Sequence, residues 1–382
     1  MKILLVQLGA NGDCLFVTTI AKQIKEKDYP NCHLSWMILD RCKQVIENNP
    51  YIDEIIPIEE TGINEARLKI GEYIEELKSQ GKFFDKIIIT DNYETNEKIW
   101  FGPLRSMYHR VYQELSGNKL IISPEPVIFL KDSEVQNVDK FVKKHKLNEQ
   151  NCFPILFECM PQSGQSTMNV EKALDIAYII TKKYPHVKII LSSKDRVESN
   201  NKNIVDGSEL SYRENAQLIN HCKLLVGVSS GITWLNTSNW SNKIPMIAYI
   251  KRYEDYYPTF SASILLDFKN LGESTDNLIE LYCTPDDNNL IDCISNVVEN
   301  SFQHAKHNFP LEDISPVEYL GKMYMAKNVL KQTIEPVDEE YKVKMYLLGC
   351  IPITATVKKY NYKQKISFCG IPILKLKGNK GV

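Results

Sequence analysis

Apolar runs of strand length alternate with amphipathic stretches through the first 150 residues. The runs fall at 2–7, 34–39, 54–58 and 86–90. After the first of them, Val17, Ile20, Ala21 and Ile24 recur at the i, i+3, i+4, i+7 spacing, which predicts a helix over 13–27. Weaker patterns predict helices at 41–48, 64–79 and 133–146 and a strand at 127–130.

A second series with the same alternation begins at Phe153. Its predicted strands are 154–159, 187–191, 224–228 and 245–249, and its predicted helices are 171–183, 210–220 and 231–238. Alternating strands and helices form a parallel sheet covered on both faces. The two series predict an α/β protein of GT-B type, with two doubly wound Rossmann-like domains, 1–150 and 151–335, facing each other across a cleft. Ligands of such sheets bind beyond the carboxyl ends of the strands.

The C-terminal part of the chain differs from both series. Helices are predicted at 286–304 and 317–334. The sequence LLGCIPI (347–353) is then repeated in part as FCGIPIL (368–374). Apolar and Lys residues alternate over 373–377, as is typical of a strand. We expect 341–382 to form a small, basic, hairpin-like appendage outside both cores.

Charge separates this appendage from the rest of the chain. The formal net charge of the 382 residues is −2, which argues against a nucleic-acid partner. Residues 341–382 nevertheless hold nine Lys and no Asp, Glu or Arg, leaving 37 basic and 48 acidic residues in 1–340. None of the ten cysteines sits in a zinc-type spacing, which suits a reducing compartment. With no signal peptide and no apolar run of about 20 residues, a cytoplasmic location is expected.

The first turn, Gly9-Ala10-Asn11-Gly12-Asp13, directly follows the first strand. It does not fit the dinucleotide pattern Gly-x-Gly-x-x-Gly, and a carboxylate here would repel a diphosphate. Asp13 is therefore either a cap of the following helix, since Asp is a common capping residue, or a general base. The spacing by itself leaves both open.

Three turns of the second domain are candidates for holding a nucleotide. Small polar residues before a helix leave backbone N–H groups for an anion. Two turns fit this description, and the residues concerned are Ser163, Gly164, Gln165 and Ser166 in the first and Ser229, Ser230, Gly231 and Thr233 in the second. Lys194 and Asp195 follow another strand, where Asp195 suits ribose hydroxyls. For each turn the alternative is an ordinary solvated loop.

The sequence resembles glycosyltransferase family 9, the heptosyltransferase-like group of GT-B enzymes that build lipopolysaccharide and related glycans. The resemblance spans about residues 1–250 and is carried by three segments: GANGDCLFVTTIAKQIKEKDYP near the N-terminus, NPYIDEIIPI (49–58) and CKLLVGVSSGITWLNTSNWSNKIPMIAY (222–249). It implies that Asp13 is the catalytic base, that the second domain binds a nucleotide-diphosphate sugar, and that the first binds the acceptor. No Asp-x-Asp occurs, in agreement with a metal-independent family, and no cofactor is expected.

The chain also departs from the family pattern. Ser229 stands where the family has Asp, Trp234 stands where it usually has His, and the loop SGQSTMN (163–169) lacks the Lys often found there. These changes leave the donor sugar open. Two alternative functions therefore remain: a non-catalytic subunit that binds a nucleotide sugar or glycan, and a GT-B nucleotide-sugar epimerase.

Acceptor-binding residues are expected on the first domain. Aromatic side chains stack on sugar rings and Arg pairs with acidic or phosphorylated glycans. The candidates are Gly12, Asn92, Tyr93, Arg105, Tyr108 and Arg110. Peripheral contact of 341–382 with an anionic membrane would bring the enzyme to a lipid-linked acceptor, at about 1 kcal/mol per Lys near the surface. A β-appendage packed on the body or an oligomer contact is the alternative.

Overall fold

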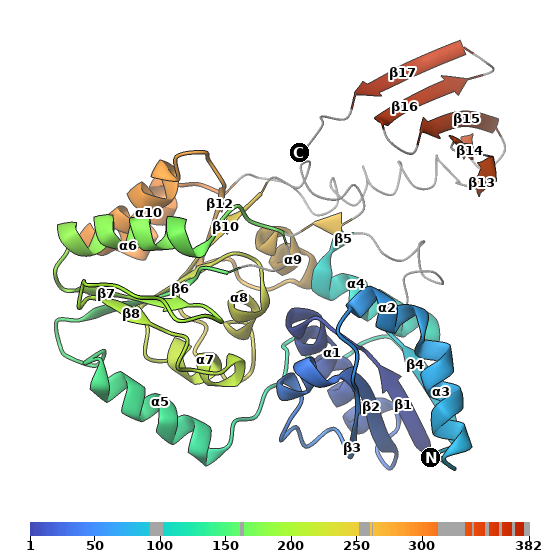
Figure 1. The fold of residues 1–382 in the computed structure, drawn as a ribbon, viewed down its shortest axis with the longest axis horizontal. Coiled ribbons are helices and arrows are strands. Elements are labelled where there is room, and N and C mark those ends of the chain that lie inside the picture. Colours follow the sequence, from blue (N-terminus) through green and yellow to red (C-terminus); the bar gives the residue numbers. More distant parts are fainter. Residues whose placement is uncertain are drawn as a thin grey trace. The chain divides into compact units, whose positions relative to one another are not determined.

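The computed structural model describes residues 1–91, 102–160, 164–251, 260–261, 263–311, 333–337, 340–347, 351–358, 361–368 and 371–377. The chain forms two compact units, Met1–Asp313 and Ile314–Val382. The first unit contains two lobes, each built on a parallel sheet (Figure 1). The predicted α/β class and the presence of two parallel sheets are confirmed.

The N-terminal lobe has a four-stranded parallel sheet in the order β3-β2-β1-β4. The strands are β1 (Lys2–Val6), β2 (His33–Leu39), β3 (Glu54–Ile58) and β4 (Lys86–Ile89). The central strand β1 pairs with both β2 and β4, so Val6 lies between Met37 and Ile89. The order reverses between β1 and β4, which makes the carboxyl ends of these two strands the switch point where such sheets bind ligands.

The helices of this lobe differ in detail from the prediction. They are α1 (Asn11–Gln23) with its π-helical extension η1 (Ile24–Asp28), the 3₁₀ segment η2 (Asp40–Val45), α2 (Ile63–Leu68), α3 (Ile70–Ser79) and α4 (Leu104–Ser116). The single helix predicted over 64–79 is broken at Lys69, and the strand predicted at 127–130 is irregular. A side chain of α1 binds this irregular segment: the Thr18 hydroxyl accepts the Val127 N–H at 2.7 Å.

The C-terminal lobe has a six-stranded parallel sheet in the order β12-β10-β9-β6-β7-β8. The strands are β6 (Phe153–Glu158), β7 (Val187–Ser192), β8 (Ile204–Asp206), β9 (Leu224–Gly227), β10 (Met246–Ile250) and β12 (Leu278–Tyr282). Numbered along the lobe, this is the Rossmann order 3-2-1-4-5-6, with its switch point between β6 and β9. The edge strands β8 and β12 were not predicted.

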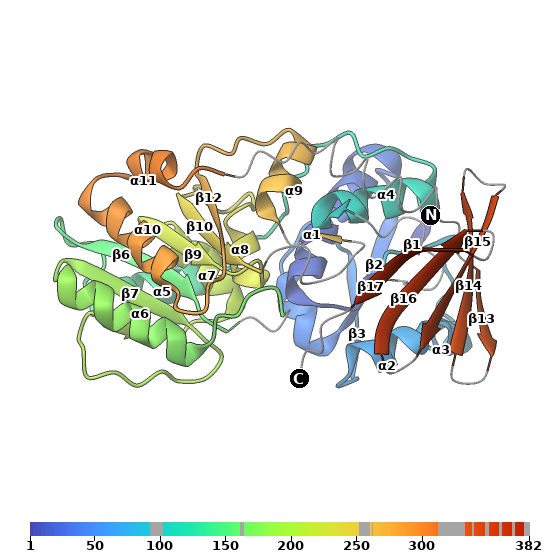
Figure 2. The same ribbon diagram turned by 90° about the horizontal axis from the view of Figure 1, so that it is seen from above.

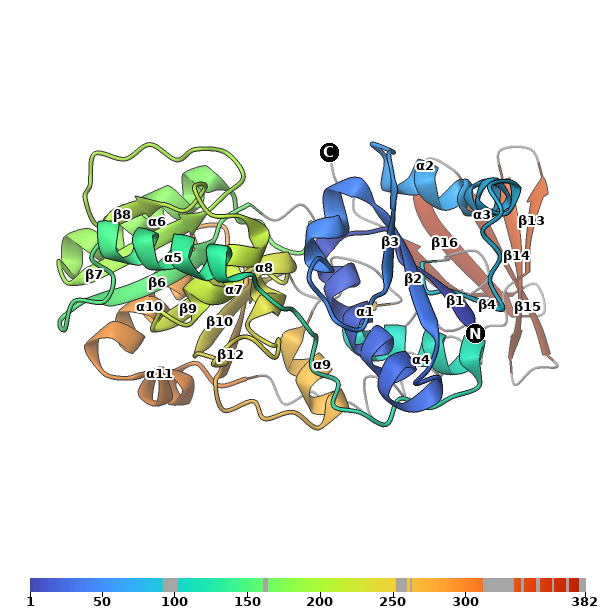
Figure 3. The ribbon, with the colours of Figure 1, turned by 90° about the horizontal axis from the view of Figure 1, so that it is seen from below.

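Alternate residues of the central strands enter two different cores. Ile155 and Phe157 of β6 pack with α6 (Val170–Lys183), α10 (Asn288–Glu299) and α11 (Phe302–Asn308). Leu156 packs on the opposite face, which the remaining helices cover: α7 (Tyr212–Ile219), α8 (Gly231–Leu235) and α9 (Ile264–Leu271). Views from above and below show these two layers in turn (Figures 2 and 3).

The two lobes share a hydrophobic core. The cluster that includes Leu156, Trp234 and Leu265 of the C-terminal lobe continues into Leu5 and Phe16 of the N-terminal lobe. Short strands also join the lobes, since β5 (Gly102–Pro103) pairs with β11 (Phe260–Ser261). Helix α5 (Asp132–Lys144), within the predicted first domain, packs instead on α7, where Asn137 Nδ2 donates to Glu214 Oε1 at 2.7 Å.

The second unit contains a five-stranded antiparallel sheet in sequential order. Its strands are β13 (Thr333–Val337), β14 (Glu340–Leu347), β15 (Ile351–Lys358), β16 (Asn361–Phe368) and β17 (Ile371–Lys377). The appendage is thus larger than a hairpin, and each Ile-Pro-Ile repeat begins a strand. Of the helix predicted at 317–334, residues 317–332 lie outside the described residues, and Thr333 and Ile334 are in β13. No helix in the described part of the chain is long and apolar enough to cross a bilayer.

Candidate functional site

The predicted chemistry lies at the switch points of the two sheets. In the N-terminal lobe, Asp13 lies in the first turn of the helix after β1, and Asp91 follows β4. In the C-terminal lobe, Glu158 ends β6, and the turn 228–231 follows β9. Because ligands of open α/β sheets bind at such points, both lobes place polar groups where a substrate is expected.

Asp13 is the third residue of α1, and Ala10 is its N-cap. The Asp13 carboxylate accepts the Ala10 N–H at 2.9 Å, so it caps the helix from inside the first turn. The side chain remains partly exposed and also hydrogen-bonds Tyr108. Burial raises the pKa of Asp13 against the lowering effect of these bonds. Asp13 thus caps the helix with one backbone hydrogen bond, and the exposed part of its carboxylate can still accept a proton.

A second carboxylate holds the same turn. Asp91 is fully buried and accepts the Leu8 N–H at 2.8 Å and the Gly9 N–H at 3.3 Å. It also accepts from Arg67 Nε at 2.6 Å. The sequence analysis missed Asp91 and Arg67. The available signal was an Asp immediately beyond a predicted strand, the position where parallel sheets gather polar groups.

A buried carboxylate also shapes the turn after β9. Glu158 accepts the Val228 N–H at 3.2 Å and the Ile232 N–H at 2.9 Å, as well as the Thr233 hydroxyl. Burial raises the pKa of Glu158, and these bonds lower it. Glu158 thereby supplies a carboxylate to a turn that has Ser229 where the family has Asp. It also satisfies first-turn groups of α8 that were expected to hold a phosphate.

The first turns of α1 and α8 meet at two glycines. A Cβ on Gly12 would lie 3.7 Å from the Cα of Gly231, which is ordinary contact. A Cβ on Gly231 would lie only 2.9 Å from Cε2 of Tyr212, whose hydroxyl donates to the Gly231 carbonyl at 3.3 Å. A larger residue at 231 would therefore displace Tyr212. The contact brings the two switch points together.

Trp234, in the position where the family usually has His, forms part of the contact between the lobes. It is buried, and its ring meets that of Phe16 edge to face with centroids 4.8 Å apart. The Arg105 guanidinium lies 5.4 Å from the Trp234 ring centre. The indole thus fills space between α1, α4 and α8 with apolar surface, where a histidine would present a polar ring.

Arg105 is fully buried in an ion-pair network between the lobes. Its Nε lies 2.5 Å from Asp267 Oδ2, its Nη1 lies 2.9 Å from Glu273 Oε1, and its backbone N–H donates to Asp267 Oδ1 at 3.1 Å. Arg105 belongs to α4 and Asp267 to α9. The acceptor role predicted for Arg105 finds no support in this position, because the guanidinium is committed to two carboxylates.

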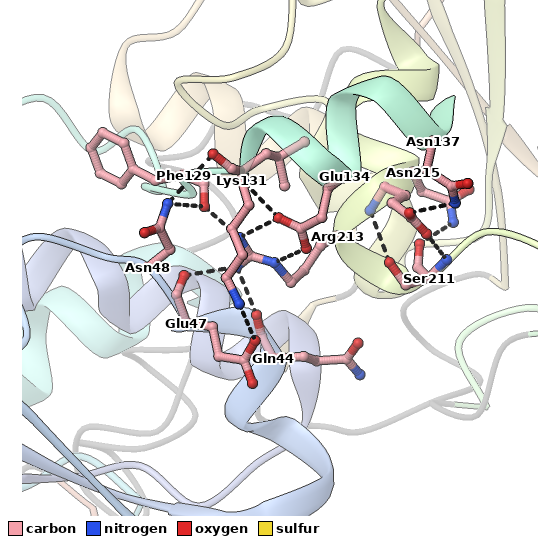
Figure 4. A network of polar contacts seen from close by, with 12 residues as sticks. Gln44, Glu47, Asn48, Phe129, Lys131, Glu134, Asn137, Ser211, Arg213 and Asn215 are labelled. Carbon is pink, nitrogen blue, oxygen red and sulfur yellow. Dashed lines mark hydrogen bonds and ion pairs between the residues drawn. The ribbon is translucent and has the colours of Figure 1, made fainter. Parts of the chain in front are cut away.

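A second arginine, Arg213, reaches from the C-terminal lobe to the N-terminal lobe. Arg213 of α7 lies 2.5 Å from Glu134 Oε1 and donates to the carbonyls of Gln44 at 2.9 Å and Glu47 at 2.8 Å (Figure 4). It also donates to the Phe129 carbonyl in the segment between the lobes. Arg105 and Arg213 therefore fix the arrangement of the lobes around the contact of α1 with α8.

The other predicted residues are more scattered. Gly164 is exposed with a φ of 70°, while Gln165 and Ser166 are buried. Lys194 and Asp195 are exposed in the loop after β7, and the Asp195 N–H donates to the Ser193 hydroxyl at 3.2 Å. Burial lowers the pKa of Arg110, on α4, to about 10. The predicted residues Ser163, Asn92 and Tyr93 lie outside the described residues.

Comparison with known proteins finds similarity at the level of structure. No family model matches the sequence, and no curated protein matches it. A family 9 glycosyltransferase from Veillonella parvula is similar over 84% of this chain and 95% of its own, at 18% identity and a TM-score of 0.53.

Two proteins from E. coli are also similar in structure. ADP-heptose lps heptosyltransferase II covers 86% of this chain and 99% of its own, at 14% identity and a TM-score of 0.48. Heptosyltransferase WaaC with ADP covers 78% and 99%, at 11% identity and 0.47. At 18% identity the Veillonella parvula structure shows the fold alone: this chain shares its two-lobed, GT-B-like architecture, so the resemblance seen in the sequence is confirmed at the level of the fold.

Proposed function

We propose that the protein is an inverting, metal-independent glycosyltransferase that moves a sugar from a nucleotide-diphosphate donor to a cell-surface glycan acceptor. Lipopolysaccharide, lipooligosaccharide and capsule are the acceptor classes. The observation that carries the proposal is the position of Asp13. A partly exposed carboxylate lies at one switch point, and the adjacent Gly12 contacts the switch point of the second lobe at Gly231.

Asp13 acts as the general base in this proposal. It takes the proton from an acceptor hydroxyl while that oxygen attacks the anomeric carbon. The bond from that carbon to the diphosphate oxygen breaks in the same displacement, which inverts the anomeric centre. General-base catalysis of this kind contributes about 10²–10⁴-fold to the rate.

We assign the donor to the C-terminal lobe, with a narrower set of contacts than the sequence predicts. Val228, Ile232 and Thr233 already bind Glu158, whose charge disfavours a phosphate beside it. The proposed diphosphate contacts are therefore the partly exposed Ser230 and Gly231, together with the turn that contains Gly164. The exposed Lys194 and Asp195 suit the nucleoside. For the acceptor, the partly exposed Gly12 and Arg110 remain the proposed contacts among the described residues, whereas Tyr108 is buried and already bonds Asp13.

A screen of ADP-, GDP-, UDP- and CMP-sugars by thermal shift tests the donor assignment. We expect one nucleotide class to raise Tm, because binding at 100 times Kd stabilises a native protein by about 2.7 kcal/mol. The corresponding free sugar is the matched control and is expected to leave Tm unchanged. No shift with any nucleotide sugar would contradict the assignment.

The bound donor is then incubated with and without glycan acceptors, and the products are identified by mass spectrometry and NMR. Transfer with inversion at the anomeric carbon is expected. Donor binding without turnover over a broad acceptor panel would instead favour the non-catalytic binding subunit. An altered nucleotide sugar formed without acceptor would favour the epimerase.

We also propose that the second unit contacts an anionic membrane surface. The register of β14 with β15 sets Lys342 and Lys344 opposite Thr356 and Thr354, while the apolar Val343 lies between them. Replacing Lys342, Lys344, Lys375 and Lys377 with Gln in the full-length chain is expected to reduce its flotation with vesicles containing phosphatidylglycerol. Each Lys near the surface contributes about 1 kcal/mol. Neutral phosphatidylcholine vesicles are the control, and equal recovery of both proteins would contradict the proposal.

A further inference from the structure

Two carboxylates bind three successive backbone amides of the β1–α1 turn. Asp91 accepts the N–H groups of Leu8 and Gly9 at 2.8 and 3.3 Å, and Asp13 accepts that of Ala10 at 2.9 Å. Like charges held this close disfavour one another, so each carboxylate favours protonation of the other. The hydrogen bonds from the backbone amides and from Tyr108 favour the ionised forms, and a nearby cation adds to this effect.

Arg67 provides that cation. It lies on α2, and its Nε is 2.6 Å from Asp91 Oδ1. The Arg67 side chain is 14% exposed and that of Asp91 is 0% exposed, so water screens this pair weakly. The positive charge of Arg67 lowers the pKa of Asp13 as well as that of Asp91, against the effect of burial, which raises both.

Other groups around Asp13 come from four elements. Tyr108 of α4 hydrogen-bonds it, while Cys14 of α1, Cys42 of η2 and Tyr212 of α7 are close enough to interact with its charge. Burial raises the pKa values of Cys14 and Tyr212, so both are neutral near pH 7. The pKa of Cys42 is lowered, chiefly by its hydrogen bond with Cys14. None of these four side chains is a cation, and the Arg41 guanidinium of η2 hydrogen-bonds Cys42.

We propose that Arg67, anchored by Asp91, is a positioning residue of the base: through Asp91 it ties α2 to the turn that carries Asp13, and its positive charge favours the carboxylate form of Asp13. This inference rests on the proposed role of Asp13 in glycosyl transfer. Asp91 serves two purposes in the arrangement, because it fixes the backbone of the turn and orients the guanidinium. Lys at position 67 would keep the charge while losing the directed Nε–H bond.

A titration of Asp13 tests the charge relationship without any substrate. The full-length protein is labelled with ¹³Cγ-Asp, and the Asp13 signal is assigned by its loss in Asp13→Asn. In Arg67→Met we expect the Asp13 titration midpoint to rise, because the positive charge of Arg67 lowers the pKa of Asp13. Arg67→Lys is expected to restore most of the wild-type midpoint, and Arg67→Gln is a second neutral variant should Arg67→Met fold poorly.

The kinetic counterpart is the acid limb of kcat against pH. We expect Arg67→Met to move this limb to higher pH by the same interval as the Asp13 midpoint and to regain activity at high pH, since a one-unit shift in pKa is a tenfold change in protonation at a given pH. The donor KM is expected to stay within about twofold of the wild-type value. A purely structural role would lower kcat at every pH. An unchanged Asp13 midpoint in both neutral variants, with an active wild-type enzyme, would overturn this inference. A shifted midpoint in a wild-type protein that transfers no sugar would instead overturn the proposed function.

Discussion

Asp13→Asn is expected to lower kcat by about 10²–10⁴-fold, the range that general-base catalysis contributes. The Asn side chain keeps an oxygen that accepts the Ala10 N–H, so the helix cap survives and only the base is lost. Burial raises the pKa of Asp13, and the base works in its ionised form. Wild-type kcat should therefore fall as pH drops through the raised pKa, and this acid limb should disappear in the variant.

Asp132→Asn is the matched control for Asp13→Asn. Asp132 also lies in the first turn of a helix, α5, but it is exposed and lies away from both switch points. We expect it to retain wild-type kcat and the wild-type pH profile. Donor binding, followed by thermal shift, should be the same in all three proteins. Near-normal turnover of Asp13→Asn with donor binding intact would remove Asp13 as the base.

Arg105→Met is expected to reduce the free energy of unfolding by about 3–5 kcal/mol, the usual cost of removing one partner of a buried ion pair. The reason is that Asp267 has its side chain buried and would be left with an uncompensated charge. Urea denaturation followed by circular dichroism measures the change. Because the pair joins α4 to α9, we also expect limited proteolysis between the lobes to become faster.

Two further proteins make this result interpretable. Arg196→Met removes an arginine that is 79% exposed and 4.0 Å from Glu198, and it should cost less than about 0.5 kcal/mol. The double variant Arg105→Met/Asp267→Asn removes both charges of the pair, and the Asn side chain keeps an oxygen that accepts the backbone N–H of residue 105. It should therefore recover part of the lost free energy of unfolding. If Arg105→Met costs no more than Arg196→Met, the buried pair does not stabilise the contact between the lobes.

The strands with continuous apolar sequences were predictable because burial on both faces of a parallel sheet requires apolar residues at nearly every position. This holds for β1, β6 and β9. The edge strands β8 and β12 were missed, since β8 has only three residues and β12 has Glu280 in its middle. Glu280 accepts from the Ser263 hydroxyl at 2.7 Å and the Leu265 N–H at 3.0 Å, a capping contact with α9 that no local pattern reveals.

The candidate site was predictable in part for the same reason. Asp13 lies in the turn after the first predicted strand, the turn at 229–231 directly follows another, and the carboxyl ends of parallel strands collect polar groups. The roles of Asp91 and Glu158 were not predictable, although each lies at the end of a strand, because their partners are distant backbone amides. Arg105 was misjudged for a related reason: an arginine among aromatic residues resembles a glycan contact until its partner is known.

The linear order of apolar and polar residues was enough to establish the α/β class, the two successive series of strands and helices, and the carboxylate at the first turn, because these depend on neighbours along the chain. Strand order, the shared core of the two lobes and the charge environment of Asp13 became clear only from the folded chain. They depend on contacts such as that of Arg105 with Asp267, which are 162 residues apart. Such contacts form only when the helices and strands pack, and the energy of a buried charge depends on the partners that packing brings to it.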